Sequence, residues 1–431
     1  MHFWGNRQGS SYGPSEARMA PVLVWLILIL CLMISLVKYT FALILKWSVP
    51  GASVQKDYSY EPDVSILMPC FNEGKTVYET IESISNSNYP KEKFEVIAQD
   101  DCSVDDSYEW MLKAQHNFSN IRIRVGRNAT NSGKARTVCN ALKSSLAELI
   151  ISIDSDCIFH PDAIRELAAC FSEPKIGSVG GRVGVRNPND NAITAIQTFI
   201  YYAAFQVYKV PENWTRSVGC ISGCLFAIRR ELLLEIEPKI RSRHWFGIPV
   251  NQGEDRFLTH QTLLRGYGTY INNDALCWTT VPSTLPDLFK QQLRWKRSII
   301  RDLFYTLRTL PQHVWTLHPN TVLTLVLTPL GALLGLLVVL TMMSGNPMEM
   351  AGPGPLVGYL AIAAILAWVI RKYSAREAVN NPLAFGAYLA WTVVSSLFLT
   401  TLALCTLDSR DWGTRAKEEV PNGDASRQGT A

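Results

Sequence analysis

The 431-residue sequence lacks several features that would place a protein in a familiar class at once. Its ten cysteines are scattered and only Cys220 and Cys224 lie close together, so neither a disulfide framework nor a cysteine metal site is indicated. The net charge of +4 is too small to indicate binding to nucleic acid. The long apolar stretches have few charges in their interiors, Lys38 excepted, which disfavours an ion transporter or channel.

What the sequence has is hydrophobicity, unevenly distributed. At 48% hydrophobic residues and a mean hydropathy of +0.06 it is too apolar for an ordinary soluble protein, although its middle is normally polar. After an N-terminal tail at 1–19, residues 20–47 contain an apolar run with few polar residues, Lys38 and Thr40 among them, long enough to cross ~30 Å of hydrocarbon as a helix. A cleaved signal peptide is the weaker alternative, because the run is too long and no small-residue cleavage site follows it.

Three further apolar stretches, at 321–343, 355–370 and 382–407, predict transmembrane or re-entrant helices within 320–407. Basic residues lie between the second and third stretches and just after the first membrane segment, namely Arg371, Lys372, Arg376, Lys46 and Lys56. By the positive-inside rule both places are cytosolic. We therefore expect a multi-pass protein of the plasma membrane whose polar middle lies in the cytoplasm.

The third apolar stretch conflicts with a simple topology. Three full crossings from a cytosolic middle would place the C-terminal tail, 408–431, outside the cell. The stretch opens with Asn380-Asn381-Pro382 and is broken by polar residues. We therefore expect a re-entrant or interfacial pair of short helices there.

Residues 286–319 combine basic and apolar side chains in one segment. The basic residues are Lys290, Arg294, Lys296, Arg297, Arg301 and Arg308, and the apolar ones recur at spacings of three and four. That pattern predicts amphipathic helices on the cytosolic surface of a lipid bilayer.

The polar middle, 57–285, alternates short β-like runs with helical segments. The predicted strands are 64–68, 94–98, 121–125 and 149–153, and the predicted helices are 76–85, 104–116 and 137–146. This rhythm predicts an α/β fold with a largely parallel, doubly wound sheet. Such sheets bind ligands at the carboxyl ends of their strands. Polar clusters follow the strands, at 69–73, 99–103 and 131–134.

Asp154-Ser155-Asp156 comes directly after the apolar run 149–153. Two carboxylates at a strand end suit a divalent cation that neutralises the diphosphate leaving group of a sugar nucleotide. A capped turn is the alternative for an isolated motif of this kind. Together with Gln291-Gln292-Leu293-Arg294-Trp295, just before the apolar stretches, the triplet suggests an enzyme that transfers a sugar at a membrane.

From residue 62 to 415 the chain resembles the processive family 2 glycosyltransferases, which include cellulose, chitin and hyaluronan synthases. The matching motifs are, in order, Pro69, Asn72 and Glu73; Asp100 and Asp101; Gly133 and Lys134; Asp154-Ser155-Asp156; Gly253-Glu254-Asp255; and Gln291, Arg294 and Trp295. The resemblance implies a GT-A-like glycosyltransferase domain fused to transmembrane and interfacial helices, in which the matched residues bind substrate.

Among these families the chain looks most like hyaluronan synthase. The shared features are Cys220-Ile221-Ser222-Gly223 before the acceptor site, the doubled Gln at 291–292 and Trp412-Gly413-Thr414-Arg415. In that family the last motif lies at the cytosolic mouth of the active site, so Gly223, Trp412 and Arg415 are predicted to contact substrate. The chain departs from the family where Cys102 replaces a Gly, Glu254 replaces an Asp and Cys224 replaces a Pro.

The resemblance gives the acidic residues separate roles. Asp100 or Asp101 is expected to bind uracil or ribose, with capping of the next helix as the alternative. Lys134 is expected to contact the diphosphate or the donor sugar. Asp156 is expected to hold Mg²⁺ or Mn²⁺, with Asp154 beside it on the metal and the nucleotide.

Asp255 is expected to be the general base that deprotonates the acceptor hydroxyl, so that an α-linked UDP-sugar gives a β-linkage. Glu254 is the competing candidate for this role. Trp295 offers a flat face for a pyranose ring and Arg294 a planar cation for the diphosphate, near the point where the acceptor enters a membrane channel. An interfacial Trp and Arg are the alternative.

The predicted function is therefore a membrane-embedded, inverting and processive synthase that exports its β-linked polysaccharide. Hyaluronan, made from UDP-glucuronate and UDP-N-acetylglucosamine, is the favoured product. Chitin or chitooligosaccharide, a cellulose-like glucan or another capsular polymer is the near alternative. An enzyme that places one sugar on a lipid carrier is disfavoured, because such enzymes usually lack the motif at 291–295.

Overall fold

The computed structural model describes residues 54–250, 252–315, 322, 325–326 and 382–409. The expected tail at 1–19, the membrane segment at 20–47 and most of the expected helices at 320–381 lie outside the described residues. Within the described ranges, no helix combines the length and the apolar character that crossing a bilayer requires.

The described part of the chain is built on an eight-stranded sheet with the order β3-β2-β1-β4-β7-β6-β10-β5. The strands are β1 (Val64–Cys70), β2 (Phe94–Asp100), β3 (Arg122–Arg127), β4 (Leu149–Ile153), β5 (Cys157–Phe159), β6 (Ile176–Val185), β7 (Leu225–Arg229) and β10 (Gly268–Thr279). Strands β3, β2, β1 and β4 are parallel, as predicted. Strand β7 runs antiparallel to both β4 and β6, and β5 is antiparallel to β10, so the sheet as a whole is mixed.

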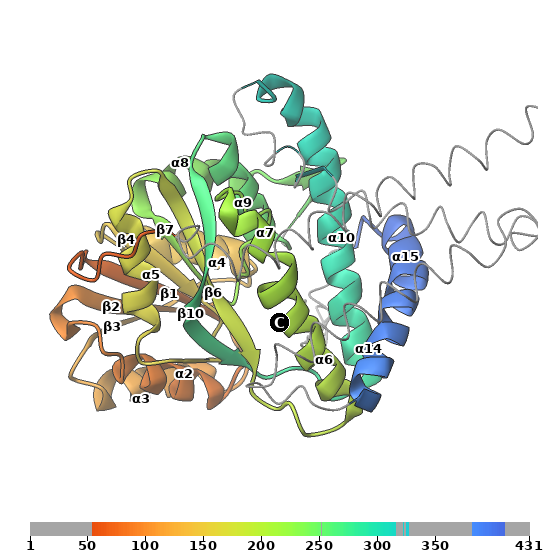
Figure 1. The fold of residues 1–431 in the computed structure, drawn as a ribbon. Coiled ribbons are helices and arrows are strands. Elements are labelled where there is room, and N and C mark those ends of the chain that lie inside the picture. The colour runs from red at the N-terminus through yellow and green to blue at the C-terminus, as the bar shows by residue number, and fades with distance from the viewer. Residues whose placement is uncertain (1–53, 251, 316–321, 323–324, 327–381, 410–431) are drawn as a thin grey trace, which may run out of the picture.

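Helices cover both faces of this sheet. They are α2 (Thr76–Ser85), α3 (Ser107–Asn117), α4 (Lys134–Leu142), α5 (Ala163–Ala169), α8 (Arg230–Arg241) and α9 (Glu254–Leu264). Figure 1 shows α2 and α3 along one side of the sheet and α8 and α9 along the other. The fold is therefore α/β and GT-A-like, as predicted.

Two predicted helices have different ends in the structure. Helix α3 starts at Ser107 rather than 104, because the Asp105 carboxylate accepts the Ser107 N–H at 3.0 Å and holds the preceding residues in a turn. Helix α4 starts already at Lys134, directly after Gly133, and ends at Leu142. The boundary at Lys134 matters because it fixes that side chain at the first helical turn.

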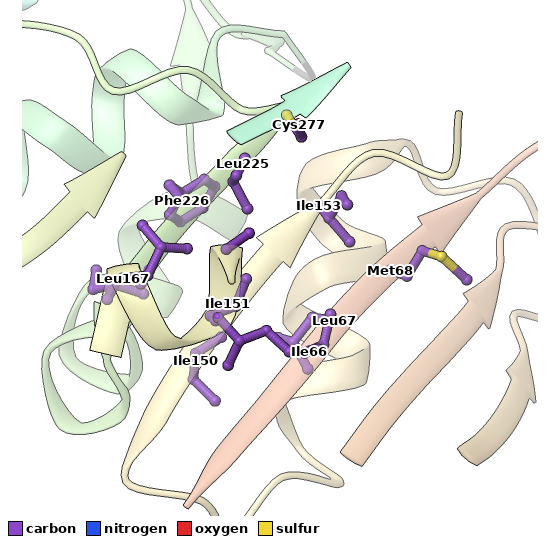
Figure 2. Close-up of a cluster of buried hydrophobic side chains, with 14 of the residues drawn as sticks. Ile66, Leu67, Met68, Ile150, Ile151, Ile153, Leu167, Leu225, Phe226 and Cys277 are labelled. Atoms are coloured by element: carbon purple, nitrogen blue, oxygen red, sulfur yellow. The ribbon is translucent and has the colours of Figure 1, made fainter. Parts of the chain in front are cut away.

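The core lies where the two parallel central strands meet their neighbours. Ile66, Leu67, Ile150 and Ile151 are completely buried, and Figure 2 shows them with Phe226 of the antiparallel strand β7. Continuous apolar runs of this kind are expected of strands covered on both faces. They hold rigid the strand ends from which the polar loops project.

A second layer of helices packs beside the sheet. It consists of α6 (Ala192–Tyr202), the π-helix η3 (Ala203–Tyr208), α7 (Val210–Trp214), α10 (Leu285–Thr309), α14 (Pro382–Val394), the π-helix η5 (Ser395–Leu399) and α15 (Thr400–Cys405). The predicted amphipathic segment thus begins with one long helix, α10. The third apolar stretch forms α14, η5 and α15, and its relation to a bilayer stays a prediction.

The apolar face of α10 is partly covered by the chain itself. Leu288, Leu293 and Ile300 form a buried cluster with Trp391 and Leu399. Figure 1 shows α10 beside α14 and α15. At the far end of α10, Phe304 and Leu307 remain about half exposed. The helix therefore packs into the described fold, and the contact of its exposed end with lipid stays a prediction.

Candidate active site

One cavity of about 840 Å³ brings together most of the predicted site residues. It lies between the strand ends of the sheet and helices α6, α9 and α10. Among its lining residues are Pro69, Glu73, Asp101, Lys134, Asp154, Asp156, Gly223, Glu254, Asp255, Gln291, Arg294 and Trp295. Asn72 and Asp100 are not among the described residues that line it, and Trp412 and Arg415 lie outside the described residues.

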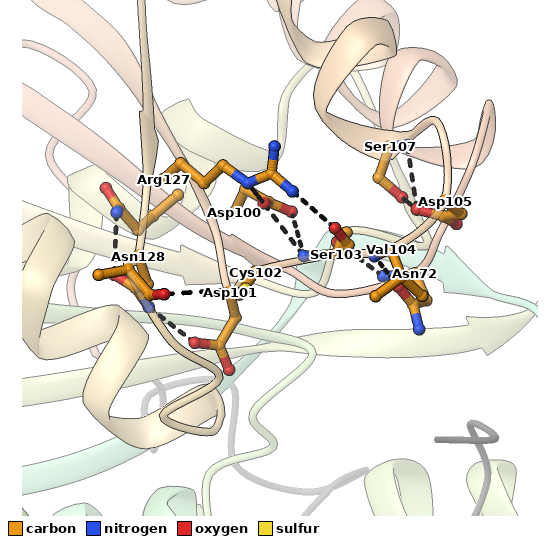
Figure 3. Close-up of polar contacts among 12 residues, drawn as sticks. Asn72, Asp100, Asp101, Cys102, Ser103, Val104, Asp105, Ser107, Arg127 and Asn128 are labelled. Carbon is orange, nitrogen blue, oxygen red and sulfur yellow. Dashed lines mark hydrogen bonds and ion pairs between the residues drawn. The ribbon is translucent and has the colours of Figure 1, made fainter. Parts of the chain in front are cut away.

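The paired acids at the end of β2 have different surroundings. Asp100 is fully buried, pairs with Arg127 at 3.0 Å between Oδ2 and Nε, and accepts the Ser103 N–H. Figure 3 shows Asp100 pointing toward Arg127 and Asp101 toward Asn128. Asp101 reaches the cavity, yet its carboxylate already accepts the backbone N–H of Gly133 at 2.7 Å. Asp100 thus fixes its own loop, and Asp101 joins that loop to the start of α4.

The loop after β1 is tied to the loop after β2. The Asn72 side chain accepts the Val104 N–H at 3.0 Å, and the Ser103 hydroxyl accepts the Asn72 N–H at 2.9 Å (Figure 3). Asn72 has a φ of +53°, a conformation that asparagine tolerates better than most residues. Its role in the structure is to shape the loop that carries Glu73 to the cavity wall.

The backbone conformation at Cys102 shows why the resembled family usually has a glycine at this position. Its φ is +65°, in the left-handed region where glycine has no steric cost. The glycine usual at this position therefore suits the backbone, and the cysteine occupies it under strain.

The Asp154-Ser155-Asp156 turn joins β4 to β5. Ser155 is buried, donates to the Glu73 carboxylate at 3.1 Å, and has its carbonyl bonded by Thr80. With Ser155 held inward, Asp154 and Asp156 on either side both line the cavity. The turn therefore brings both acidic residues of the triplet to the cavity, and their roles on the metal and the nucleotide stay predictions.

Lys134 connects three parts of the site. Its Nζ lies 2.5 Å from Asp154 Oδ1 and 3.3 Å from Glu254 Oε1, and it donates to the Gly223 carbonyl at 3.2 Å. Burial alone would lower the pKa of Lys134, but the Asp154 and Glu254 carboxylates outweigh burial and raise it. Lys134 is consequently a fixed cation at the centre of the cavity.

Gly223 lies close to both Lys134 and Asp255, so a side chain there would have to displace the end of Lys134. A Cβ placed there would lie 2.9 Å from Lys134 Nζ and 3.4 Å from Asp255 Cβ. The Gly223 N–H donates to Asp255 Oδ2 at 3.1 Å. The predicted acceptor segment is thus bonded directly to the predicted base.

Asp255 and Glu254 stand in the first turn of α9 but differ in their partners. Asp255 accepts two backbone N–H groups, from Gly223 and from Arg256 at 2.8 Å, whereas Glu254 pairs with Lys134. The partial positive charge at a helix N-terminus favours both anions. Of the two carboxylates, Asp255 is held by backbone N–H groups, whereas Glu254 forms an ion pair with a lysine.

The motif at 291–295 faces the cavity from α10. Gln291 Oε1 and Arg294 Nε are buried and have no hydrogen-bond partner among the described residues. Trp295 is half buried and meets Tyr201 edge to face, with ring centroids 6.1 Å apart. Both residues line the cavity, so these two atoms are available to a ligand bound there.

Several wall residues were not predicted. Helix α6 contributes Tyr201, η3 contributes Phe205, and Lys209 lies between η3 and α7; Arg256 follows the predicted base. Arg256 was within reach of sequence reasoning because it adjoins Asp255. The others come from a segment for which no helix and no motif was predicted.

The cavity suits a divalent cation that is shared with a substrate. No three His, Cys, Asp or Glu side chains of the described residues are grouped closely enough to hold a metal by themselves. Mg²⁺ in proteins usually takes one or two carboxylates and completes its shell with substrate phosphates and water. Asp156, with Asp154 beside it, supplies such a donor set.

Comparison with known proteins agrees with this geometry. Residues 62–298 match the family model described as "Glycosyltransferase like family 2". An N-acetylglucosaminyltransferase of Rhizobium sp. (strain N33) is 30% identical over 365 residues, covering 84% of this chain and 79% of the relative. A hyaluronan synthase of Streptococcus pyogenes is 25% identical over 375 residues, covering 85% of each chain.

The fold also has a solved counterpart. A mannosyltransferase of Pyrobaculum calidifontis, in complex with GDP-Man and Mn²⁺, superposes with a TM-score of 0.52 at 19% identity, covering 86% of this chain and 96% of that one. This likeness supports the GT-A-like fold. Because the family match spans more than half of the chain and includes the cavity, the protein belongs to glycosyltransferase family 2 and is a glycosyltransferase.

Proposed function

We propose that this protein transfers N-acetylglucosamine from UDP-N-acetylglucosamine to the end of a growing β-linked glycan, with inversion at the anomeric carbon. One observation carries the proposal: the predicted donor acids, the predicted base and the motif at 291–295 line a single cavity. A donor and an acceptor sugar bound in that space would meet beside Asp255. The shared cavity is what a one-step transfer between two sugars requires.

The chemistry is a direct displacement. The acceptor hydroxyl oxygen attacks the anomeric carbon as Asp255 accepts its proton, and the bond from that carbon to the diphosphate oxygen breaks, releasing UDP. Attack from the face opposite the leaving group converts an α-linked donor to a β-linked product. The two N–H groups that Asp255 accepts aim its carboxylate without neutralising it.

Glu254 is the weaker candidate for the base. Its carboxylate pairs with Lys134, which also holds Asp154 and the Gly223 carbonyl. An ion-paired carboxylate is a poorer proton acceptor than a free one, because the lysine stabilises its charged form. Glu254 is better suited to positioning Lys134.

The leaving group needs positive charge as it departs. Asp156, with Asp154, would hold Mg²⁺ or Mn²⁺, and the cation would neutralise charge that develops on the diphosphate. Lys134 is also available, since it lies on the cavity wall beside Asp154. Binding of the diphosphate is expected to draw the lysine from its present carboxylate partners toward phosphate oxygens.

The acceptor end belongs beside α10. Trp295 presents an aromatic face of the kind on which pyranose rings stack, and Arg294 and Gln291 offer buried polar atoms that lack partners among the described residues. These groups would hold the terminal sugar with its hydroxyl toward Asp255. The predicted contacts of Trp412 and Arg415 with substrate remain predictions.

Two products deserve separate tests. A polymer or oligomer of N-acetylglucosamine is favoured by the 30% identity to a protein named N-acetylglucosaminyltransferase. Hyaluronan is the second candidate, favoured by the 25% identity to a hyaluronan synthase and by the motifs at 220–223 and 412–415. UDP-N-acetylglucosamine is the donor that both candidates need.

The expected setting is the cytosolic face of the plasma membrane. Apolar segments at 20–47 and 320–407 would anchor the protein and form an exit for the product, since a hydrated glycan cannot cross hydrocarbon unaided. The UDP-sugars would reach the cavity from the cytosol.

Membranes containing the protein test this function. They are incubated with radiolabelled UDP-N-acetylglucosamine, with UDP-glucuronate, or with both, and the products are sized. Product from UDP-N-acetylglucosamine alone supports the first candidate, and long polymer only with both donors supports hyaluronan. A single sugar on a lipid, or no transfer, contradicts the processive function.

A further inference from the structure

A buried acid on α10, outside the predicted motifs, lies behind the candidate base. Asp302 is 1% exposed, and its two carboxylate oxygens face two arginines. Oδ1 lies 3.5 Å from Arg243 and Oδ2 lies 4.0 Å from Nε of Arg256. A charge this deep in the protein is retained only where its partners compensate it.

Arg243 connects Asp302 to the loop that precedes α9. It donates to the Gln252 carbonyl at 3.1 Å and stacks over the Phe257 ring, with 4.5 Å between the guanidinium carbon and the ring centroid. Gln252 immediately precedes Gly253-Glu254-Asp255. Asp302 therefore holds, through one arginine, the backbone that leads into the base.

The same loop is in close contact with α10 at a second point. Gly253 has a φ of +70°, and a Cβ there would lie 1.8 Å from the Ser298 hydroxyl. Ser298 lies one turn before Asp302 on α10. The base loop is thus seated on the face of the helix that also carries Trp295 toward the cavity.

Arg256 is the second partner of Asp302, and it also lies next to the carboxylate of the candidate base in the sequence. It lines the cavity and directly follows Asp255. Burial lowers the pKa of Arg256, but Cys220 and then the carboxylates of Asp302 and Asp255 outweigh burial and raise it. A guanidinium binds a carboxylate strongly when nothing competes for it. Without Asp302, the carboxylate of the base, on the adjacent residue, would be left among the acids that interact with Arg256.

We propose that Asp302 is a positioning residue that holds Arg256 away from Asp255 and so keeps the base free to accept the acceptor proton. The proposal rests on the function proposed above. Helix α10 then has two roles, because Trp295 binds the acceptor and Asp302, two turns later on the same helix, sets the state of the base. Acceptor binding and proton removal are consequently governed by one rigid element.

The experiment compares Asp302→Asn with a matched control in detergent-solubilised, full-length protein. Glu95→Gln is the control, because Glu95 is also buried and paired with an arginine, Arg124 at 2.5 Å, but does not line the cavity. For each variant we measure kcat with UDP-N-acetylglucosamine, KM, the Kd of UDP and the melting temperature. Asp302→Asn should lower kcat on the order of 10- to 100-fold while the Kd of UDP changes little. Glu95→Gln should lower the melting temperature and leave kcat close to the parent value.

A second variant guards against loss of folding. Arg243→Gln combined with Asp302→Asn replaces a buried ion pair by two neutral amides, which proteins tolerate better than one unpaired charge. It should fold and should still show the low kcat, because Arg256 has lost its anchor. A parent-like kcat in the double variant overturns the proposal.

The remaining outcomes are also decisive. If Asp302→Asn loses kcat and UDP affinity together, and no more than its loss of folded protein explains, Asp302 has only a structural role. If the parent protein transfers no sugar, the proposed function is wrong and the role of Asp302 falls with it. An active parent with an equally active Asp302→Asn variant contradicts this inference alone.

Discussion

The two sides of the cavity differ in how completely their polar groups are satisfied. On the proposed nucleotide side, Asp101 on the cavity wall and Asp100, which does not line the cavity, bind Arg127, Asn128 and backbone N–H groups through their carboxylates. On the proposed acceptor side, Gln291 and Arg294 have buried polar atoms without a hydrogen-bond partner in the described part of the chain. The polar groups on the first side are therefore satisfied within the protein, whereas those on the second side are available to a bound substrate.

The contrast separates two kinds of motif residue. Mutation of a residue that holds a loop should mainly lower the stability of the protein. Mutation of a residue that contacts a ligand should mainly lower the activity. Mutations on the two sides should therefore fail in different ways.

The largest effect is expected from the base. Asp255→Asn should lower sugar transfer by about 10²–10⁴-fold, because a positioned base contributes that much, and should leave UDP binding nearly intact. Radiolabel incorporation and UDP titration measure the two quantities. Glu254→Gln serves as the comparison and should lose less, since Glu254 is paired with Lys134. Near-parent synthesis by Asp255→Asn would remove it from this role.

The acceptor side should lose activity without losing stability. Arg294→Met should reduce transfer on the order of 10- to 100-fold, since a charge-assisted contact with substrate is lost. It should leave the free energy of unfolding unchanged or higher, because a buried N–H without a partner disappears. Arg308→Met, an exposed change on the same helix, should alter neither. A clear drop in melting temperature for Arg294→Met would contradict the contrast.

The nucleotide side should show the reverse behaviour. Asp100→Asn should lower the free energy of unfolding by about 1–3 kcal/mol, because it leaves a buried hydrogen-bond network incomplete. Thermal melting with and without UDP measures this change. If the variant melts like the parent but no longer binds UDP, Asp100 contacts the nucleotide directly, as the sequence first indicated.

The pH dependence of activity tests the role of Asp302, the buried acid next to the candidate base. Burial raises the pKa of Asp302 to about 6, against the opposing effect of Arg243 and Arg256; Asp255 raises it further and Arg301 lowers it. Above pH 6 the acid is ionised and holds Arg256, whereas below it the acid is neutral, as in Asp302→Asn. The ratio of parent to variant activity should therefore be largest above about pH 7 and fall toward one below about pH 5. A ratio that does not change with pH would show that the charge of Asp302 is unimportant.

The smallest effect concerns the strained loop. Cys102→Gly should raise the free energy of unfolding by up to about 1 kcal/mol, because glycine adopts a positive φ without steric cost. The greater freedom of glycine in the unfolded chain offsets part of this gain. Melting curves of Cys102→Gly and Cys102→Ala measure it. Since alanine keeps its Cβ, only glycine should stabilise; equal melting temperatures would exclude strain at this position.

Patterns local in the sequence were sufficient for the first half of the sheet. Strands β1, β2, β3 and β4 fall where apolar runs predict them, and their polar loops lie at the carboxyl ends as expected. The reversal of β7 could not be read in the same way. Its five residues look like any buried strand, and its direction depends on pairing with β4 and β6, which are distant in sequence.

The site could be predicted as a set of residues but not as a network. Motif spacing identified Asp154, Asp255 and Trp295, which share the cavity. It could not show that Asp100 is sealed behind Arg127, since that pair joins two strands. Asp302 carried one weak signal, an acid among basic residues seven positions after Trp295, which places both on one side of a helix.

The contact between Gly253 and Ser298 also limits how such enzymes can be recombined. With a Cβ at 253 only 1.8 Å from the serine hydroxyl, the loop accepts just a small neighbour on α10. A chimera that joins the sheet of this glycosyltransferase to the C-terminal part of another should keep α10 with the sheet donor and place its junction after Thr309. A chimera whose junction separates Gly253 from Ser298 would need both residues taken from the same parent protein.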